Sequence, residues 1–241
     1  MFAIFNSKMK LKTIFFLFLT IQNLVIAQDI VMPKTFIFFP GAFQRWEYKI
    51  STGISLTRLP NEIIEEEINT LPTLNADFKM GLPLKFMLHS RINTNYISNM
   101  LSLAIQKNII NRKIAIATGI NTSYWFGQLY QDVIRLKAYG FIVNPYIACG
   151  FHFNDIYLSL KFENQYSIMK TSSENAMLGR SSQPNSAYAI QFIIEQPLWK
   201  NNWVALGVKL NYSKFYYQAW LTYTAIDEYL LYPEYSFTFI F

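Results

Sequence analysis

The sequence predicts an all-β fold: an antiparallel transmembrane β-barrel of about ten strands, with eight as the alternative, and one short helix in a connecting loop. Three observations predict it, namely an export signal at the amino terminus, long segments of alternating apolar and polar residues, and aromatic residues at the segment ends. The composition agrees, because only 15% of the 241 residues are charged, whereas a soluble domain carries about 25%. With 52% hydrophobic residues, a disordered chain is excluded.

Residues 1–27 have the order of a secretory signal peptide. Basic residues up to Lys12 precede an apolar run over 13–21, and Ala27 supplies the small residue before the expected cleavage site. The alternative is a membrane-anchoring helix, but polar residues at 22–23 end the run before the roughly 20 apolar residues that a span needs. We therefore expect a cleaved signal peptide over 1–27 and a barrel over 28–241.

Charge and cysteine content limit the classes of partner and site. Loss of residues 1–27 removes three lysines and no acidic residue, so the formal net charge falls from +6 to +3. Since no basic stripe remains, we expect no nucleic-acid partner. The single cysteine, Cys149, excludes an internal disulfide and a metal site built from cysteines.

The chain after the signal alternates with a period of two, as a strand with one apolar and one polar face does. Around residue 50, for example, Tyr48, Ile50 and Ile54 share one face and Lys49 and Ser51 the other. Barrels of single bacterial chains have even strand numbers. The expected strands lie near residues 43–57, 74–89, 94–106, 112–126, 138–153, 155–170, 186–198, 202–218 and 230–241, with residues 31–39 as the best candidate for a tenth.

Strand length favours a barrel in lipid over a soluble sandwich. Most of the segments exceed the five or six residues that are usual in sandwiches and reach the roughly 9–11 that an oblique bilayer crossing needs. Their polar faces are rich in Gly, Ala, Ser, Asn and Lys, which suits a tight, hydrated interior. Aromatic residues such as Trp46, Trp125 and Trp199 fall at segment ends, where barrels place rings at the membrane interfaces.

The connections predict an orientation. Residues 154–155 and 200–202 form tight turns, which face the periplasm in such barrels, whereas the polar stretch 171–185 is expected to be a long outer loop. Residues 61–71 read as a short acidic helix, and counting strands back from the tight turns puts it on the periplasmic side. A helix that covers the rim is the favoured interpretation; docking of a partner and plugging of the barrel mouth are the alternatives.

The last strand carries the most specific local pattern. Tyr235, Phe237, Phe239 and Phe241 share one face, and Phe241 ends the sequence. This resembles the closing strand of Gram-negative outer-membrane β-barrel proteins. The resemblance implies residence in the cell outer membrane, contact with outer-membrane lipid, and recognition of these four residues as an assembly signal by the barrel assembly machinery. A further periplasmic or surface partner is left open.

Charged side chains on the polar faces are expected to line the lumen. Because barrels of about eight strands are filled by side chains, we expect them to form a salt-bridged interior. The alternative is a narrow pore with a weak preference for anions, since seven of the side chains are basic and four acidic. They are Arg45, Glu47, Lys49, Asp77, Lys79, Lys85, Lys113, Lys161, Glu163, Glu195 and Lys209.

Motifs that carry catalysis are missing from the sequence. It has no glycine-rich phosphate loop, no His-Glu-x-x-His and no Gly-x-Ser-x-Gly. His89 and Ser90 are neighbours, but neighbouring side chains of a strand point to opposite faces, so they do not pair as base and nucleophile. We therefore expect no catalytic, cofactor-binding or metal-binding residues, and a structural, binding or assembly role. A lipid-modifying outer-membrane enzyme is the less favoured alternative.

Overall fold

A computed structural model describes residues 36–63, 69–131, 134–173, 176–199, 202–220 and 228–241. The predicted signal peptide over 1–27 and most of the candidate strand over 31–39 lie outside these residues. The described chain is all-β, with ten antiparallel strands that close into a barrel, so the predicted fold class and the higher of the two strand numbers are confirmed. Among the described residues, no helix is long and apolar enough to cross a membrane.

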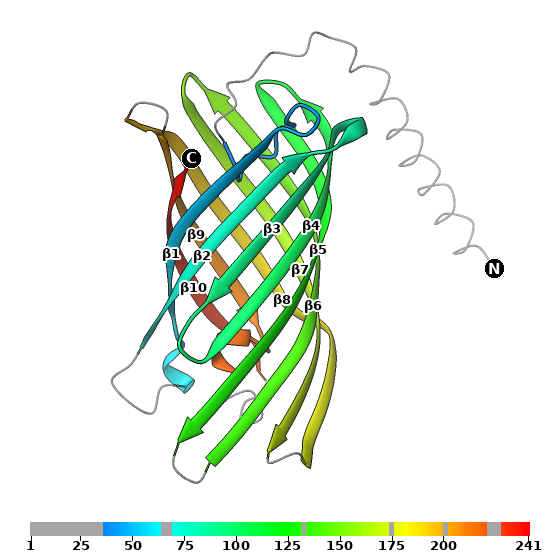
Figure 1. The fold of residues 1–241 in the computed structure, drawn as a ribbon, viewed down its shortest axis with the longest axis vertical. Coiled ribbons are helices and arrows are strands. Elements are labelled where there is room, and N and C mark those ends of the chain that lie inside the picture. Colours follow the sequence, from blue (N-terminus) through cyan, green and yellow to red (C-terminus); the bar gives the residue numbers. More distant parts are fainter. Residues whose placement is uncertain (1–35, 64–68, 132–133, 174–175, 200–201, 221–227) are drawn as a thin grey trace, which may run out of the picture. The chain divides into compact units, whose positions relative to one another are not determined.

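The strands follow one another around the barrel in sequence order (Figure 1). They are β1 (Tyr48–Arg58), β2 (Thr70–Gly81), β3 (Phe86–Thr94), β4 (Ser98–Asn111), β5 (Ile114–Gln131), β6 (Ile134–Phe153), β7 (Ile156–Ser173), β8 (Ala176–Trp199), β9 (Asn202–Ser213) and β10 (Leu230–Ile240). Three short 3-10 turns occur in the connections: η1 (Asn61–Ile63), η2 (Pro83–Lys85) and η3 (Tyr217–Ala219).

The first and last strands close the barrel. β10 pairs with β1 from Ser51 opposite Ile240 to Thr57 opposite Glu234. The backbone N–H of Phe241 also donates to the carbonyl of Ile50, at 3.0 Å. Closure leaves no unpaired strand edge around the barrel wall, which is the condition for a sheet in lipid.

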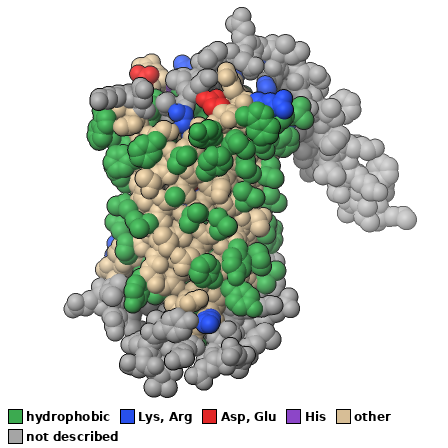
Figure 2. All heavy atoms as spheres, in the orientation of Figure 1, with side chains coloured by type: hydrophobic (Ala, Val, Ile, Leu, Met, Phe, Trp, Pro, Cys, Tyr) green, Lys and Arg blue, Asp and Glu red, His purple; other side chains and the backbone are tan. Residues whose placement is uncertain are grey.

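The alternating pattern separates the two faces of the wall as the sequence predicts. On β1, Ser51, Ser55 and Thr57 are fully buried inside, whereas Ile54 and Leu56 are exposed outside. Large apolar side chains are exposed on all ten strands or at their ends. In Figure 2 hydrophobic side chains are spread over the wall and are densest towards its two ends, beyond which the charged ones gather. The apolar face of this sheet therefore points outward.

The tenth strand does not come from residues 31–39. In the described part of that stretch, residues 36–39 form bends and not a strand. The extra strand arises because the predicted strand 74–89 is broken by η2 into β2 and β3. Pro83 has no N–H to donate to a ladder, and Leu84 and Lys85 adopt left-handed backbone angles, with φ of 60° and 61°.

Because of this additional strand, the connection 59–69 lies at the end of the barrel opposite to the predicted one. The connections 82–85, 112–113, 154–155 and 200–201 lie at one end of the barrel, which we call the short-turn end. The connection 59–69 lies at the opposite, loop end, so its predicted periplasmic placement beside the tight turns is wrong. The predicted helix is also shorter: η1 covers 61–63, Leu71 belongs to β2, and residues 64–68 lie outside the described chain.

The predicted outer loop 171–185 is mainly strand. β7 and β8 remain paired from Gln165 opposite Ala187 to Ser173 opposite Ala176. β5 and β6 continue to Gln131 opposite Ile134, although β4 leaves β5 at Gly127. The four strands β5–β8 thus extend beyond the others at the loop end (Figure 1).

Candidate functional site

The inside of the barrel has three layers: an apolar layer at each end and a polar layer between them. The apolar layer at the short-turn end is built on residues 36–43, which we call the amino-terminal segment. The layer at the loop end is built on residues 215–220, the loop segment. Both segments leave the sheet and turn into the lumen, so wall residues far apart in sequence meet around them.

The amino-terminal segment fills its end of the lumen with aromatic side chains. Phe36, Ile37, Phe39 and Phe43 are buried there and pack against wall residues. The Phe36 and Phe39 rings each lie about 5 Å from the ring of Tyr157, the distance of a favourable aromatic pair. These contacts bury the apolar side chains of the segment inside the lumen, away from water.

Two buried charges hold the backbone of this segment. The Glu195 carboxylate accepts hydrogen bonds from the backbone N–H groups of Ile37 (2.6 Å), Phe38 (3.0 Å) and Phe39 (2.6 Å). The Lys79 ammonium donates to the carbonyl of Phe39 at 2.8 Å. Glu195 and Lys79 are 0% and 1% exposed, so these bonds replace the water that both charges lose.

Two asparagines and a glycine complete the wall around the segment. Asn108 donates to the Pro40 carbonyl at 2.5 Å, and the Asn111 side-chain oxygen accepts from the Ala42 N–H at 3.0 Å. Gly150 of β6 leaves room, because a Cβ there would lie 2.5 Å from the Phe39 ring and 2.6 Å from Pro40. The segment therefore fits a wall that is shaped to its backbone and its rings.

The loop segment closes the other end in a similar way. Phe215 and Trp220 are buried with Trp125 and Met169. A Cβ at Gly127 would lie 2.3 Å from the Trp220 indole nitrogen, so this wall position also requires a glycine. The sequence predicts a strand over 202–218, but β9 ends at Ser213, where the chain turns inward.

Two tyrosines of the loop segment form hydrogen bonds at the lumen mouth. The Tyr216 hydroxyl contacts Thr57 at 3.1 Å and donates to Glu234 at 3.2 Å, and the Tyr217 hydroxyl accepts from Gln218 at 3.0 Å. Burial, and secondarily the nearby Glu234 carboxylate, raise the pKa of Tyr216 and of Tyr217 above the ordinary phenol value. Both hydroxyls therefore stay protonated at neutral pH.

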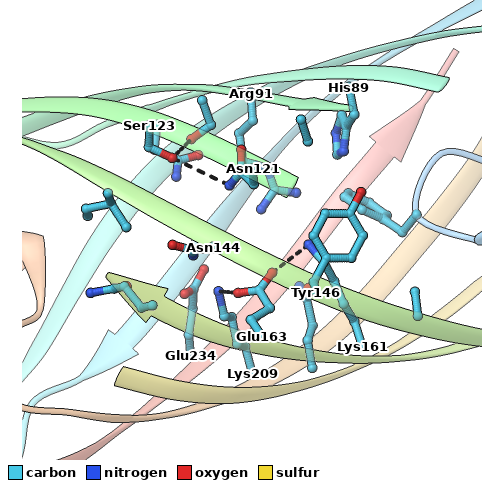
Figure 3. Close-up of a pocket in the computed structure, with 18 of the residues that line it drawn as sticks. His89, Arg91, Asn121, Ser123, Asn144, Tyr146, Lys161, Glu163, Lys209 and Glu234 are labelled. Carbon is cyan, nitrogen blue, oxygen red and sulfur yellow. Dashed lines mark hydrogen bonds and ion pairs between the residues drawn. The ribbon is translucent and has the colours of Figure 1, made fainter. Parts of the chain in front are cut away.

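A polar cavity of about 120 Å³ lies between the two segments. Its side chains point toward one another from opposite walls in Figure 3. Glu163 is at its centre and pairs with Lys161 at 2.5 Å and with Lys209 at 2.7 Å. The Lys161 ammonium also lies 4.1 Å from the centre of the Tyr146 ring. One carboxylate thus pairs with cations from two strands, β7 and β9.

A second ion cluster joins β2 and β3 at the edge of the cavity. Asp77 is buried and accepts from Arg91 Nε at 2.6 Å and contacts His89 Nε2 at 2.8 Å. Asp77 and Arg91 lie opposite each other in the hairpin register, which brings the pair together. On the next two strands of the same wall, β4 and β5, Ser102 and Ser123 share a hydrogen bond of 2.8 Å.

The charges expected to line the lumen divide into three groups. Lys79, Lys161, Glu163 and Lys209 line the cavity, while Asp77 and Glu195 are buried in the wall beside it. Glu47 and Lys49 are partly exposed near the short-turn end, where Glu47 accepts from the N–H of Gln44. Three others are exposed and lie outside the strands, so they do not line the lumen as expected: Arg45, Lys85 and Lys113.

The lumen charges expected from the sequence do not include three residues that line the cavity, His89, Arg91 and Glu234. The cause for the first two is the turn at Pro83: without it, neither β3 nor the pairing of Asp77 with Arg91 can be placed. The inward turn of both apolar segments was also missed. Nothing in local periodicity distinguishes them from strands.

The chemistry of this interior is that of a filled and neutralised core. Polar atoms of Asn121, Asn144 and Ser159 face the cavity without a protein partner, and ordered water satisfies such groups in protein interiors. Among the described residues, no group of three or more His, Cys, Asp and Glu could hold a metal ion. His89 is held by Asp77, as a catalytic base is, but among the described residues no hydroxyl nucleophile forms a hydrogen bond with it.

Comparison with known proteins gives matches at the level of structure. No protein-family model and no curated protein sequence matches this chain. Solved structures similar to it include Neisserial surface protein A (8% identity, TM-score 0.39, 80% of this chain and 95% of that one). They also include the outer-membrane protease OmpT of Escherichia coli (11%, 0.42, 80% and 93%). The attachment invasion locus protein Ail of Yersinia pestis is a third (10%, 0.39, 82% and 100%).

Proposed function

We propose that the protein resides in the cell outer membrane as a barrel with a sealed lumen, and that it has a structural or binding role there. The observation that carries this proposal is the closure of both lumen ends by buried segments, 36–43 and 215–220, around a neutralised polar layer. A barrel built to conduct needs a continuous aqueous path. This interior is filled in the manner of small barrels.

Exposed apolar side chains support the membrane location. Side chains such as Ile54, Leu103, Ile147 and Phe192 are more than two-fifths exposed on the outer wall. An exposed apolar surface that runs around a whole protein is stable against lipid and not against water. The expected export signal over 1–27 is consistent with this location.

The extension of β5–β8 supports a binding role over a purely structural one. These strands continue past the ends of β4 and β9 at the loop end. Longer connections face outward in bacterial barrels, so the extension would present an ordered surface on the cell exterior.

The pore and enzyme alternatives receive less support. Around the cavity four cations are matched by four carboxylates, namely Lys79, Arg91, Lys161 and Lys209 by Asp77, Glu163, Glu195 and Glu234. That balance gives no basis for anion preference. The His89–Asp77 pair lies between the two apolar segments, where a lipid substrate has no path to it.

Assembly through the closing strand remains part of the proposal. Tyr235, Phe237 and Phe241 are exposed on the outer face of β10, and Phe239 is partly exposed there. The same strand pairs with β1 to complete the barrel. We propose that the barrel assembly machinery reads this aromatic face before the strand closes.

Single-channel recording tests the sealed lumen. Purified protein is inserted into planar bilayers, and insertion is checked by flotation of the matching vesicles. We expect no discrete conductance steps above the leak of the bilayer. Steady steps from the wild-type chain would contradict the sealed lumen and favour the pore alternative.

A further inference from the structure

We propose that the wall around Glu195 and Lys79 is a binding site for an extended aromatic peptide, and that residues 36–43 occupy it as an intramolecular ligand. The segment leaves this site as a unit and thereby opens the polar cavity toward the short-turn end. The proposal concerns the inside of the barrel and does not depend on the role of its outer surface.

The wall recognises the segment as a receptor recognises a peptide. Its residues 36–43 belong to no strand, and wall side chains replace a ladder: Glu195 binds three N–H groups, Lys79 and Asn108 bind carbonyls, and Asn111 binds one more N–H. Backbone recognition by side chains on β2, β4 and β8 holds the chain without merging it into the sheet. Such a ligand can separate without breaking any strand pairing.

Charge in the site is the second argument. A wall that is filled once and permanently is at least as stable with apolar residues, because burial of an ion has a high desolvation cost. Glu195 and Lys79 are instead fully buried under the segment, and the Lys79 ammonium lies 5.7 Å and 5.6 Å from the Phe36 and Phe43 ring centres. Since Lys79 borders the polar cavity, water can hydrate these charges when the segment leaves.

A strained turn directly follows the segment and provides its hinge. The N–H of Glu47 donates to the carbonyl of Gln44 at 3.1 Å, which reverses the chain from the lumen into β1. Trp46 within this turn has a φ of 66°, an uncommon conformation for a bulky residue. Strain of this kind concentrates at segments that switch between positions.

Labelling of a buried thiol tests the proposal in the full chain. Cys149, which is exposed, is first replaced by serine, and Ile37→Cys then places one thiol in a position that is 0% exposed. The refolded barrel in detergent is treated with a charged, membrane-impermeant thiol reagent. We expect slow but complete labelling in this background, because the thiol reacts only while the segment is out.

The matched carboxylates separate release of the segment from general loosening. Glu195→Gln removes the charge that binds three N–H groups, so we expect labelling at least about tenfold faster. Glu163→Gln removes another buried carboxylate, which does not touch the segment, and we expect labelling within about twofold of the background. Equal acceleration by both variants would overturn the assignment to Glu195.

A second pair of variants changes no charge, so the proposal can still be tested if Glu195→Gln does not fold. Gly150→Val removes the space for Phe39 and Pro40, and should accelerate labelling; Gly127→Val disturbs only Trp220 at the opposite end, and should not. A second reporter, Ser159→Cys, places the thiol in the cavity wall. If the segment leaves as a unit, labelling at 159 should be accelerated by the same variants that accelerate labelling at 37, and not by their controls.

Three outcomes would overturn the proposal. Rapid labelling of Ile37→Cys in the background would mean that the segment does not occupy the lumen. Protection in every variant would mean that it never leaves. Faster labelling at position 37 without any change at position 159 would mean that the segment frays locally and does not open the cavity.

Discussion

Neighbouring residues of one strand have opposite surroundings in this barrel. Ser159 of β7 is buried against the cavity, whereas Leu160 is on the outer face, paired with the exposed Cys149 and Phe192. A single substitution at each position therefore probes the two environments with the backbone unchanged.

We expect Leu160→Arg to impair folding far more than Ser159→Arg. An arginine on the lipid face near mid-bilayer costs about 2–4 kcal/mol, while an arginine at 159 can extend into the cavity toward Glu163. The measurement is the folded fraction against urea concentration, read by gel mobility of unboiled samples. Equal tolerance at the two positions would mean that the faces are assigned wrongly.

The buried tyrosines at the loop end predict an alkaline weakness. Burial raises the pKa of Tyr217, so in the unfolded chain its phenol ionises above about pH 10 while the folded one keeps its proton. The unfolded state then binds fewer protons, and the free energy of unfolding falls by about 1.4 kcal/mol per pH unit above pH 10 for each such group. Stability from this group is complete below pH 10 and is lost above it.

Tyr217→Phe tests this pH dependence. At pH 8 the variant loses the hydrogen bond from Gln218 and should be less stable by about 1 kcal/mol. Between pH 10 and pH 11 its free energy of unfolding should fall less steeply than that of the wild type. Parallel curves for the two proteins over this range would show that Tyr217 ionises as freely in the folded barrel as in the unfolded chain.

At the scale of elements, the sequence predicts some strands closely but does not reveal one of the turns. β7 and β10 were predicted within a few residues, because their alternation is uninterrupted. The turn at Pro83 was missed, since apolar residues on both sides continue the pattern through it. One missed turn created one missing strand, and it also moved the connection 59–69 to the wrong end of the barrel.

The two lumen segments could not be predicted from local pattern. Residues 36–39 are four consecutive apolar residues, which fit a strand as well as a buried plug. Their binding partners are distant in sequence: Glu195 is 156 residues from Phe39, and Lys79 is 40. The charges at 79, 161, 163 and 209 were placed in the interior because they follow the alternation, but their partners depend on strand register.

At the element scale, the closing strand gives a prediction about assembly. Deletion of Phe241 removes one exposed ring and the hydrogen bond from its N–H to Ile50. Refolding in detergent should change little, because β10 keeps its pairing with β1. In cells the folded yield should fall several-fold if this residue is part of the assembly signal. Unchanged yield in cells would remove Phe241 from that role.

At the scale of the whole molecule, the closed barrel leads to a prediction about cell fractionation. A closed barrel with an apolar exterior should sediment with outer membranes and resist extraction by carbonate, since it has no stable state in water. It should also migrate differently on gels before and after boiling, because the closed sheet survives detergent at room temperature. Recovery in the soluble periplasmic fraction would contradict the membrane location.

The positions of the tryptophans make their fluorescence a probe of the lumen. Of the five tryptophans, Trp125, Trp203 and Trp220 are buried inside, and Trp46 and Trp199 are exposed outside. Trp203 packs in the layer of the amino-terminal segment and Trp220 in the loop segment. Quenchers carried on brominated lipid chains would therefore dim the outer pair alone. The remaining emission would report on the two ends of the lumen, from Trp203 at the short-turn end and from Trp125 and Trp220 at the loop end.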